Sequence, residues 1–309
     1  MSKYWAEKPY YSLDYYLKHT FGEKVYRLSL DIGTTCPNRD GLISTKGCIF
    51  CSSKGSGDFS APRAFNITKQ IETAKEYVSK KYHCNSYIAY FQAFTGTYGP
   101  FDMLKNAYTE AISHPDIKAI SIATRPDCLS EEILDLLSKL NNIKPVWIEL
   151  GLQTIHPKTA VFIRRGYELS CFEEAVKKLR SININVIPHV ILCLPNETRT
   201  DMLETINYLN KQDIQGIKIH LLHILTDTDL YTYYLDHPFY IPTMDEYFEL
   251  LGDCINHLRD DIVIHRLTGD GPTQILYAPT WTIGKRFVLN KMSAYFKEHE
   301  KWQGKDYNG

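Results

Sequence analysis

Short apolar runs alternate with longer amphipathic segments along most of this chain. The apolar runs predict β-strands near 25–32, 87–93, 117–124, 146–151, 185–193, 216–222 and 262–265. The segments between them, beginning with 67–82, have the periodicity of amphipathic helices. Repeated strand–helix units favour a parallel sheet, and six or seven of them indicate an α/β fold that forms a whole or partial barrel.

Four polar residues mark expected helix starts. Ser130 precedes two glutamates and an apolar run, while Ser170, Thr198 and Thr243 each stand three residues before Glu or Asp. This is the spacing of a capping box, in which the two side chains bond the backbone N–H groups at a helix N-terminus.

The predicted strands have one apolar face and one face that carries polar groups. Lys218 and His220 alternate with isoleucines, Glu149 and Gln153 share one face, and His189 lies between apolar neighbours. A small barrel normally fills its lumen with Val, Ile and Leu, and unpaired buried charges are costly. We therefore expect a lumen that holds a polar ligand and water, with internal ion pairs as the alternative.

The length of 309 residues, 44% of them hydrophobic, fits one α/β domain of roughly 250 residues with extensions. We expect residues 1–24 to form an N-terminal extension packed on the barrel and 25–265 to form the barrel. Residues 266–309 are expected to form a C-terminal extension with one helix around 284–299.

Charge and hydropathy exclude some classes of protein. No run reaches the ~18 apolar residues of a membrane span, and the N-terminus has no signal-peptide pattern. We therefore expect a cytoplasmic protein without a membrane partner, whose eight cysteines are not a disulfide framework. A net charge of −1 gives no global basic field, and no DNA partner is expected.

Cys36, Cys48 and Cys51 leave the end of the first predicted strand in one Gly-rich loop, here named the cysteine loop (residues 36–51). The spacing of the last two lets both sulfurs reach one metal centre. A structural zinc site typically needs four ligands, and the chain has no second C-x-x-C pair. Three thiolates leave one iron of a [4Fe–4S] cluster open to a substrate or cofactor. The loop alone favours such a cluster, with zinc plus a remote fourth ligand, or unligated structural cysteines, as alternatives.

Further polar motifs follow the other predicted strands, at the ends that carry the site in barrel folds. They are Phe91-Gln-Ala-Phe-Thr-Gly-Thr-Tyr98, Ala123-Thr-Arg-Pro-Asp127, Glu149-Leu-Gly-Leu-Gln153 with Arg165-Gly166 downstream, and His265-Arg-Leu-Thr-Gly-Asp270.

With these motifs, and the Cys-Pro-Asn-Arg-Asp-Gly opening of the cysteine loop, the chain resembles the radical S-adenosylmethionine (SAM) enzymes. The resemblance runs from about Tyr10 to Tyr307 and is to small bacterial proteins related to the radical domain of the Elongator catalytic subunit. It implies a partial (β/α)6 TIM-like barrel with a [4Fe–4S] cluster on the three cysteines. It also implies SAM bound at the fourth iron, its reductive cleavage to a 5′-deoxyadenosyl radical, and an electron donor such as flavodoxin or ferredoxin.

The resemblance also implies SAM-binding roles. Gln153 and Arg165 match residues that hold the ribose and carboxylate of SAM in related enzymes. Gln92 and Thr95 occupy the place of the family's Gly-Gly-Glu segment, which binds the amine of SAM and is absent here. The expected cofactor-binding residues are Gln92, Thr95, Glu149, Gln153, Arg165, His189 and His220, and no catalytic residue is assigned.

Eleven residues separate Cys36 from Cys48, more than the usual three and similar to the long spacing of the Elongator group. Elongator's acetyl-CoA-using domain has no room after Asp270, so acetyl transfer is not expected. The resemblance implies tRNA as the substrate, at the C5 side chain of a wobble uridine, and the abundant aromatic residues suit an unstacked base. The alternatives are the same chemistry on a small molecule or peptide, and a non-catalytic zinc-binding module.

Overall fold

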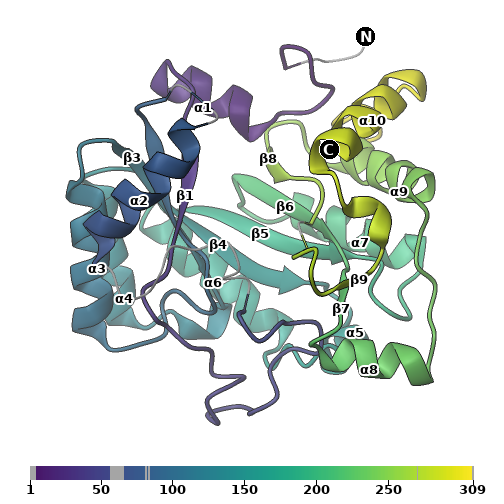
Figure 1. Cartoon of the computed structure of the whole chain (residues 1–309), viewed down its shortest axis with the longest axis horizontal. Helices are drawn as coiled ribbons and strands as arrows, with labels where there is room; N and C mark the ends of the chain where they lie inside the picture. The colour runs from purple at the N-terminus through teal and green to yellow at the C-terminus, as the bar shows by residue number, and fades with distance from the viewer. Residues whose placement is uncertain (1–4, 56–65, 81, 83, 270, 308–309) are drawn as a thin grey trace.

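The computed structural model describes residues 5–55, 66–80, 82, 84–269 and 271–307 (Figure 1). Within them, one curved sheet of parallel strands has the order β1-β2-β3-β4-β5-β6-β8. Its strands are β1 (Tyr26–Leu30), β2 (Tyr87–Phe91), β3 (Ile117–Thr124), β4 (Val146–Gln153), β5 (Asn185–Leu192), β6 (Gly216–Leu221) and β8 (Val263–Arg266). Neighbours in sequence are neighbours in the sheet, which confirms the predicted α/β partial barrel.

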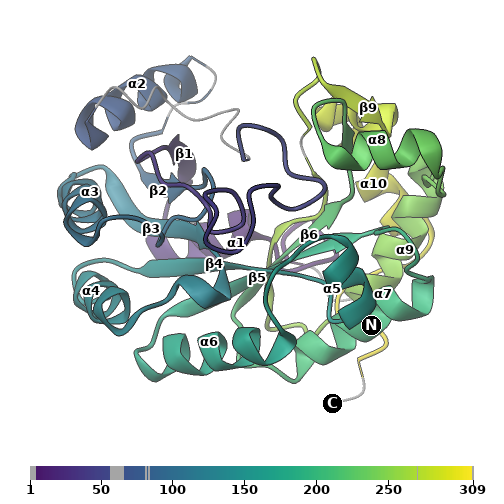
Figure 2. The same cartoon turned by 90° about the horizontal axis from the view of Figure 1, so that it is seen from below.

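Helices cover the convex face of the sheet, as Figures 1 and 2 show from two directions. Those that follow the first five strands are α2 (Ile67–Ser79), α3 (Phe101–Ser113), η1 (Pro126–Cys128), α4 (Glu131–Asn141), α5 (Pro157–Phe162), α6 (Leu169–Ser181) and α7 (Arg199–Asn210). Later come α8 (Asp229–Asp236) and α9 (Met244–His257). The main hydrophobic core lies between helices and sheet and takes up the predicted apolar strand faces, including Ile217, Ile219 and Leu221.

Three of the four predicted helix starts are correct. Ser130 caps α4 by accepting a bond from a backbone N–H group, and Thr198 and Thr243 form complete capping boxes. The fourth is wrong, because α6 begins at Leu169 with Glu168 as its N-cap. The backbone just before α6 is held by Arg165, whose Nε donates to the carbonyl of Tyr167. The helix begins directly after this point, so Ser170 lies in its first turn and cannot be the N-cap.

The chain outside the barrel closes one end of the lumen and flanks the other. Helix α1 (Leu13–Phe21) packs at the amino ends of the strands, where Leu17, Ile88, Trp147 and Ile187 share a small apolar cluster. After β8 come β9 (Leu276–Ala278), η2 (Thr280–Thr282) and α10 (Lys285–Glu298), and β9 pairs with β7 (Ile224–Leu225). The division at 24/25 and 265/266 stays a prediction. In the described part of the chain, no helix is long and apolar enough to cross a membrane.

Candidate active site

A cavity of about 340 Å³ lies at the carboxyl ends of the strands, beneath the cysteine loop. In Figure 2 this loop, in dark purple after β1, crosses in front of the strand ends. All of the expected metal and cofactor ligands line this cavity: Cys36, Cys48, Cys51, Gln92, Thr95, Glu149, Gln153, Arg165, His189 and His220. The structure therefore brings together residues from β1 to β6 that lie far apart in the sequence. Asp270, of the motif after β8, lies outside the described residues.

The cysteine loop is folded by its own polar groups. Asn38 Nδ2 donates to Cys48 Sγ at 3.6 Å, and Arg39 Nη2 donates to the carbonyls of Cys51 and Ser52 at 2.9 and 2.7 Å. Hydrogen bonding from Cys51 lowers the pKa of Cys48 to about 7, with further help from Asn38 and nearby arginines. The same hydrogen bond and burial raise the pKa of Cys51, so in the absence of a metal Cys51 keeps its proton and donates to Cys48.

The sulfur positions help to choose between a cluster and a single zinc ion. All three cysteines are free and half-buried. Zinc would hold tetrahedral sulfurs roughly 3.8 Å apart, since a Zn–S bond is about 2.3 Å long. Some groups of three side chains in the described part of the chain have all their ligand atoms within 4.8 Å of one another. Cys36, Cys48 and Cys51 do not form such a group. Three thiols that do not gather into one such compact group fit a [4Fe–4S] cluster, which would be held by Cys36, Cys48 and Cys51.

Segments much later in the sequence fix the position of the cysteine loop. Ile49 N donates to the carbonyl of Ile163, just after α5, and its own carbonyl accepts from Leu230 N in α8. Asp227 Oδ2 accepts from both the backbone N and the Oγ of Ser53 at 3.0 Å. A separate hydrophobic cluster joins Ile49 to Ile163 and Leu230. The loop is therefore part of the packed structure although it has no helix or strand.

The segment after β2, in the place of the absent Gly-Gly-Glu motif, is tightly packed. Phe94 N donates to the carbonyl of Gly55 at 3.0 Å, and Thr95 N to the carbonyl of Thr35 at 3.1 Å. Phe94 has φ of 55°, a left-handed conformation that costs roughly 1 kcal/mol or more in a non-glycine residue. A Cβ on Gly96 would stand 2.7 Å from the side chain of Ile122, so only glycine fits there. These contacts fix the backbone that presents Thr95 to the cavity.

Arg165 shapes the end of β4, where Gln153 lies. Its guanidinium is buried and donates to the carbonyls of Leu152 at 3.2 Å and Thr154 at 2.7 Å through Nη1, and to Tyr167 through Nε. Gln153 has φ of 64°, and its Oε1 accepts from Tyr167 Oη at 3.3 Å. Arg165 therefore holds the strained turn that turns Gln153 toward the cavity, a role that the sequence did not reveal.

A layer of charged and polar side chains lies deeper in the lumen, centred on the fully buried carboxylate of Glu149. It accepts from Ser121 Oγ at 2.8 Å and His189 Nε2 at 2.9 Å, and it pairs with Lys218 and, at 3.4 Å, with Arg27. Burial alone would raise the pKa of Glu149, but Lys218 and Arg27 outweigh it and hold this pKa well below its usual range. Internal ion pairs, the alternative considered for polar lumen residues, therefore occupy both oxygens of this expected cofactor ligand.

Sequence reasoning missed several residues of this layer. Tyr90 Oη accepts from Lys218 Nζ at 3.1 Å, and Arg27 Nη2 lies 2.8 Å from His265 Nδ1. Arg266 at the end of β8 lines the same cavity. The alternation of polar and apolar positions placed Lys218 on a lumen face, but it did not show that Lys218 and Arg27 share one carboxylate.

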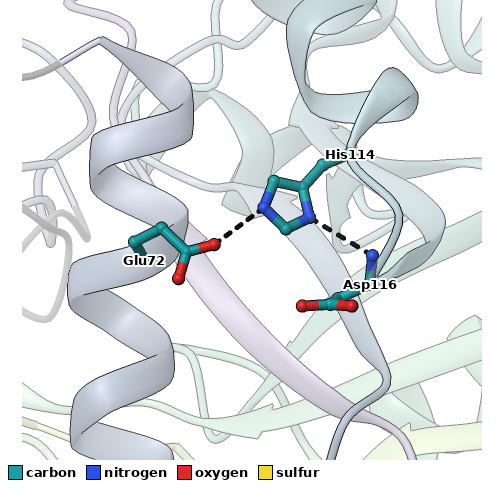
Figure 3. A group of neighbouring side chains, drawn as sticks. All are labelled: Glu72, His114 and Asp116. Atoms are coloured by element: carbon teal, nitrogen blue, oxygen red, sulfur yellow. Dashed lines mark hydrogen bonds and ion pairs between the residues drawn. The ribbon is translucent and has the colours of Figure 1, made fainter.

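Glu72, His114 and Asp116 form a second group with the composition of a metal site, on the outer side of the barrel (Figure 3). Asp116 N donates to His114 Nδ1 at 3.2 Å, so the other ring nitrogen carries the hydrogen and donates to Glu72 at 2.9 Å. Lys75 Nζ donates to Glu72 at 2.9 Å and to Asp116 at 2.6 Å. An ammonium group thus already neutralises both carboxylates, and the network joins α2 to the start of β3.

Comparison with known proteins agrees with the geometry. The model of the Radical SAM superfamily matches residues 32–209, and that of the Radical SAM C-terminal domain matches 214–298. Bacillus subtilis YtqA is 40% identical over 300 residues, which cover 97% of this chain and 93% of that protein. Methanocaldococcus jannaschii MJ0486 is 33% identical over 297 residues, 94% of this chain and 89% of that protein. Escherichia coli YhcC is 31% identical over 284 residues, 92% and 91% of the two chains.

Solved structures share the fold. An N-terminally truncated archaeal Elp3 from Methanocaldococcus infernus superposes with a TM-score of 0.68 at 15% identity, over 90% of this chain and 64% of that one. Streptococcus suis SuiB gives a TM-score of 0.52 at 12% identity, over 84% and 53%. At these identities the likeness concerns the fold alone, and the family follows from the sequence matches. The chain belongs to the radical SAM superfamily, whose cofactors are a [4Fe–4S] cluster and S-adenosylmethionine.

Proposed function

We propose that this protein is a radical SAM enzyme that modifies the C5 side chain of a wobble uridine in tRNA. The observation that carries the proposal is the convergence of three free cysteines and seven expected cofactor-binding residues on one cavity. The reduced cluster and bound SAM would together supply a 5′-deoxyadenosyl radical that abstracts hydrogen from the substrate.

The residues of the chain bind and orient. Cys36, Cys48 and Cys51 would hold the cluster, in a loop whose backbone is fixed by α5 and α8. Gln153 would bind the ribose of SAM, from a turn that Arg165 stabilises. The cysteine loop lines the cavity together with residues from the strand ends, so cofactor and substrate would meet in one site.

The substrate class rests on different support. A cavity of about 340 Å³ cannot take a duplex, so a nucleic acid would have to insert a single unstacked base, as a tRNA anticodon loop can. The archaeal Elp3 structure shares the fold over most of this chain, in agreement with the Elongator-like motifs around the cysteine loop. The electron that reduces the cluster would come from a donor such as flavodoxin or ferredoxin.

A peptide substrate is the second candidate. The fold is also shared, with a TM-score of 0.50, by Streptococcus suis SuiB bound to its precursor peptide SuiA. A peptide side chain would enter the same cavity, so the two candidates differ in what binds around its mouth and agree on the cofactors.

The test is an anaerobic assay of reductant-dependent conversion of SAM to 5′-deoxyadenosine by the reconstituted enzyme. The substrate arm compares two tRNAs that differ only at the wobble base, U or C, each with the modifications made by a strain lacking this protein. Stimulation by the U-containing tRNA alone supports the proposal, and equal turnover with both, or with neither, refutes the wobble-uridine assignment. Cys48→Ala is the matched inactive control.

A further inference from the structure

The cavity ends on side chains that donate hydrogen bonds. Lys218 and His220 are successive lumen-facing residues of β6, and both line the cavity on the side away from the cysteine loop. Lys218 is 1% exposed, and its Nζ bonds Tyr90 Oη and the Glu149 carboxylate. An ammonium group has three hydrogens, so these two bonds leave it one more to donate.

Among the described residues that line the cavity, the one carboxylate, that of Glu149, is fully used by the protein. Both oxygens of Glu149 accept from neighbours, through Ser121 and Arg27 on one oxygen and His189 and Lys218 on the other. Because both oxygens of Glu149 already accept, a ligand that bonds Lys218 Nζ must itself supply the acceptor atom.

His220 can provide the second donor, in the tautomer that carries hydrogen on Nε2. Its Nε2 is buried and has no hydrogen-bond partner among the described residues. Its ring centroid lies 5.2 Å from that of His189. Native proteins seldom leave a buried polar atom unpaired, so an atom of this kind that lines a cavity points to a ligand.

The electrostatics also favour an anion. Burial lowers the pKa of Lys218, and Glu149 only partly offsets this, so a second negative charge would stabilise the ammonium form. Burial lowers the pKa of His220, and the nearby charges of Arg266 and Lys218 lower it further, while Glu149 opposes them. A neutral imidazole with an Nε2–H group can donate to an anion.

We propose that Lys218 Nζ and His220 Nε2 form a subsite for an anionic oxygen group, carboxylate or phosphate, on the part of the substrate that reaches the cavity floor. This rests on the proposed function in that the substrate enters the cavity under the cysteine loop. Lys218 and His220 are then specificity-determining residues, while Glu149 is a positioning residue that fixes Lys218.

The experiment uses equilibrium dialysis to measure the binding of two nucleoside pairs to the reconstituted holoenzyme, with SAM and no reductant. Each pair consists of an anion and a neutral partner of similar shape. Uridine-5-acetic acid is compared with its methyl ester, and uridine 5′-monophosphate with uridine. We expect one anion of the two pairs to bind about tenfold or more tightly than its neutral partner, as for a charge-assisted hydrogen bond. The pair that shows the preference identifies carboxylate or phosphate as the group bound.

His220→Phe, assayed at a SAM concentration that saturates the variant, should reduce that preference to less than threefold, while His299→Phe, at an exposed residue after α10, should leave the preference intact. Lys218→Met alone would remove one of the two cations that pair with the buried Glu149 and so destabilise the protein. The lysine is therefore tested in the Glu149→Gln/Lys218→Met double variant, which should also lose the preference. No preference in the wild type, or a full preference in both lumen variants, overturns the subsite.

A separate arm distinguishes this subsite from the tRNA proposal. If none of the four nucleosides binds, free acetate and inorganic phosphate are tested as probes of the holoenzyme's Tm. A rise in Tm with either ion that His220→Phe abolishes would keep the subsite and reject a uridine substrate. No rise with either ion, or an equal rise in His220→Phe, would reject the subsite.

Discussion

Replacing Glu149 with Gln would test whether this residue is a structural anchor of the lumen. The substitution keeps the shape of the side chain and removes its charge. Lys218 and Arg27 would then share an uncharged amide in place of a carboxylate, in a site where Glu149 is 0% and Lys218 1% exposed. Solvent cannot replace the lost partner at this depth.

The magnitude follows from the burial. Breaking a buried ion pair by removing one partner costs about 3–5 kcal/mol, because it leaves the other charge uncompensated. Since two cations depend on this carboxylate, we expect about 4 kcal/mol of lost stability for Glu149→Gln. The double variant with Lys218→Met removes one stranded cation, so it should be about 1–3 kcal/mol more stable than the sum of the single changes.

The assay is urea unfolding of the metal-free protein at pH 7, followed by circular dichroism and by tryptophan fluorescence. Ser121→Ala is the matched control, because it removes one neutral donor from the same carboxylate and should cost only about 1 kcal/mol. A Glu149→Gln protein within 1 kcal/mol of the wild type, or additive costs in the double variant, would show that the ion pair does not stabilise the fold.

Further predictions concern the cofactors and pH. Cys48→Ala should abolish reductive SAM cleavage, whereas Cys254→Ala, at a buried residue of α9, should not. Activity in the Cys48→Ala protein would remove Cys48 from the set of cluster ligands. Arg165→Ala should weaken SAM binding about tenfold at unchanged iron content, because three carbonyls around Gln153 lose their donor; equilibrium dialysis with an unchanged Kd would contradict this. Burial lowers the pKa of His189 from 6.5 to about 4 in the folded protein. Between these two pH values the imidazole is protonated in the unfolded state but not in the folded state, so the free energy of unfolding decreases as the pH falls. The slope from His189 is at most about 1.4 kcal/mol per pH unit, and equal slopes in urea titrations of wild type and His189→Gln would refute it.

Much of the fold could be predicted because a parallel sheet imposes a simple rule on its strands. One face of each strand must pack on helices. The alternation of Ile217, Lys218 and Ile219 therefore predicted both the strand β6 and which of its faces is apolar. The cysteines and the strand-end motifs could likewise be placed in one site, since the carboxyl ends of such strands converge.

Partners that depend on long-range contacts could not be predicted. Lys218 and His189 appeared as lumen residues, but nothing local shows that Glu149 binds both of them. Arg165 carries no signal that its donors reach three backbone carbonyls. The short strands β7 and β9 have only two and three residues, too few for any periodicity.

The anchoring of the cysteine loop affects when the protein can acquire its cluster during synthesis. Cys36, Cys48 and Cys51 leave the ribosome early, but the residues that fix their loop, Ile163, Asp227 and Leu230, follow much later in the chain. A nascent chain that ends before α8 has the thiols without the contacts that hold them in place. We therefore expect a cluster to be inserted only after α8 has been synthesised, and until then the three cysteines would depend on reducing surroundings to stay unoxidised.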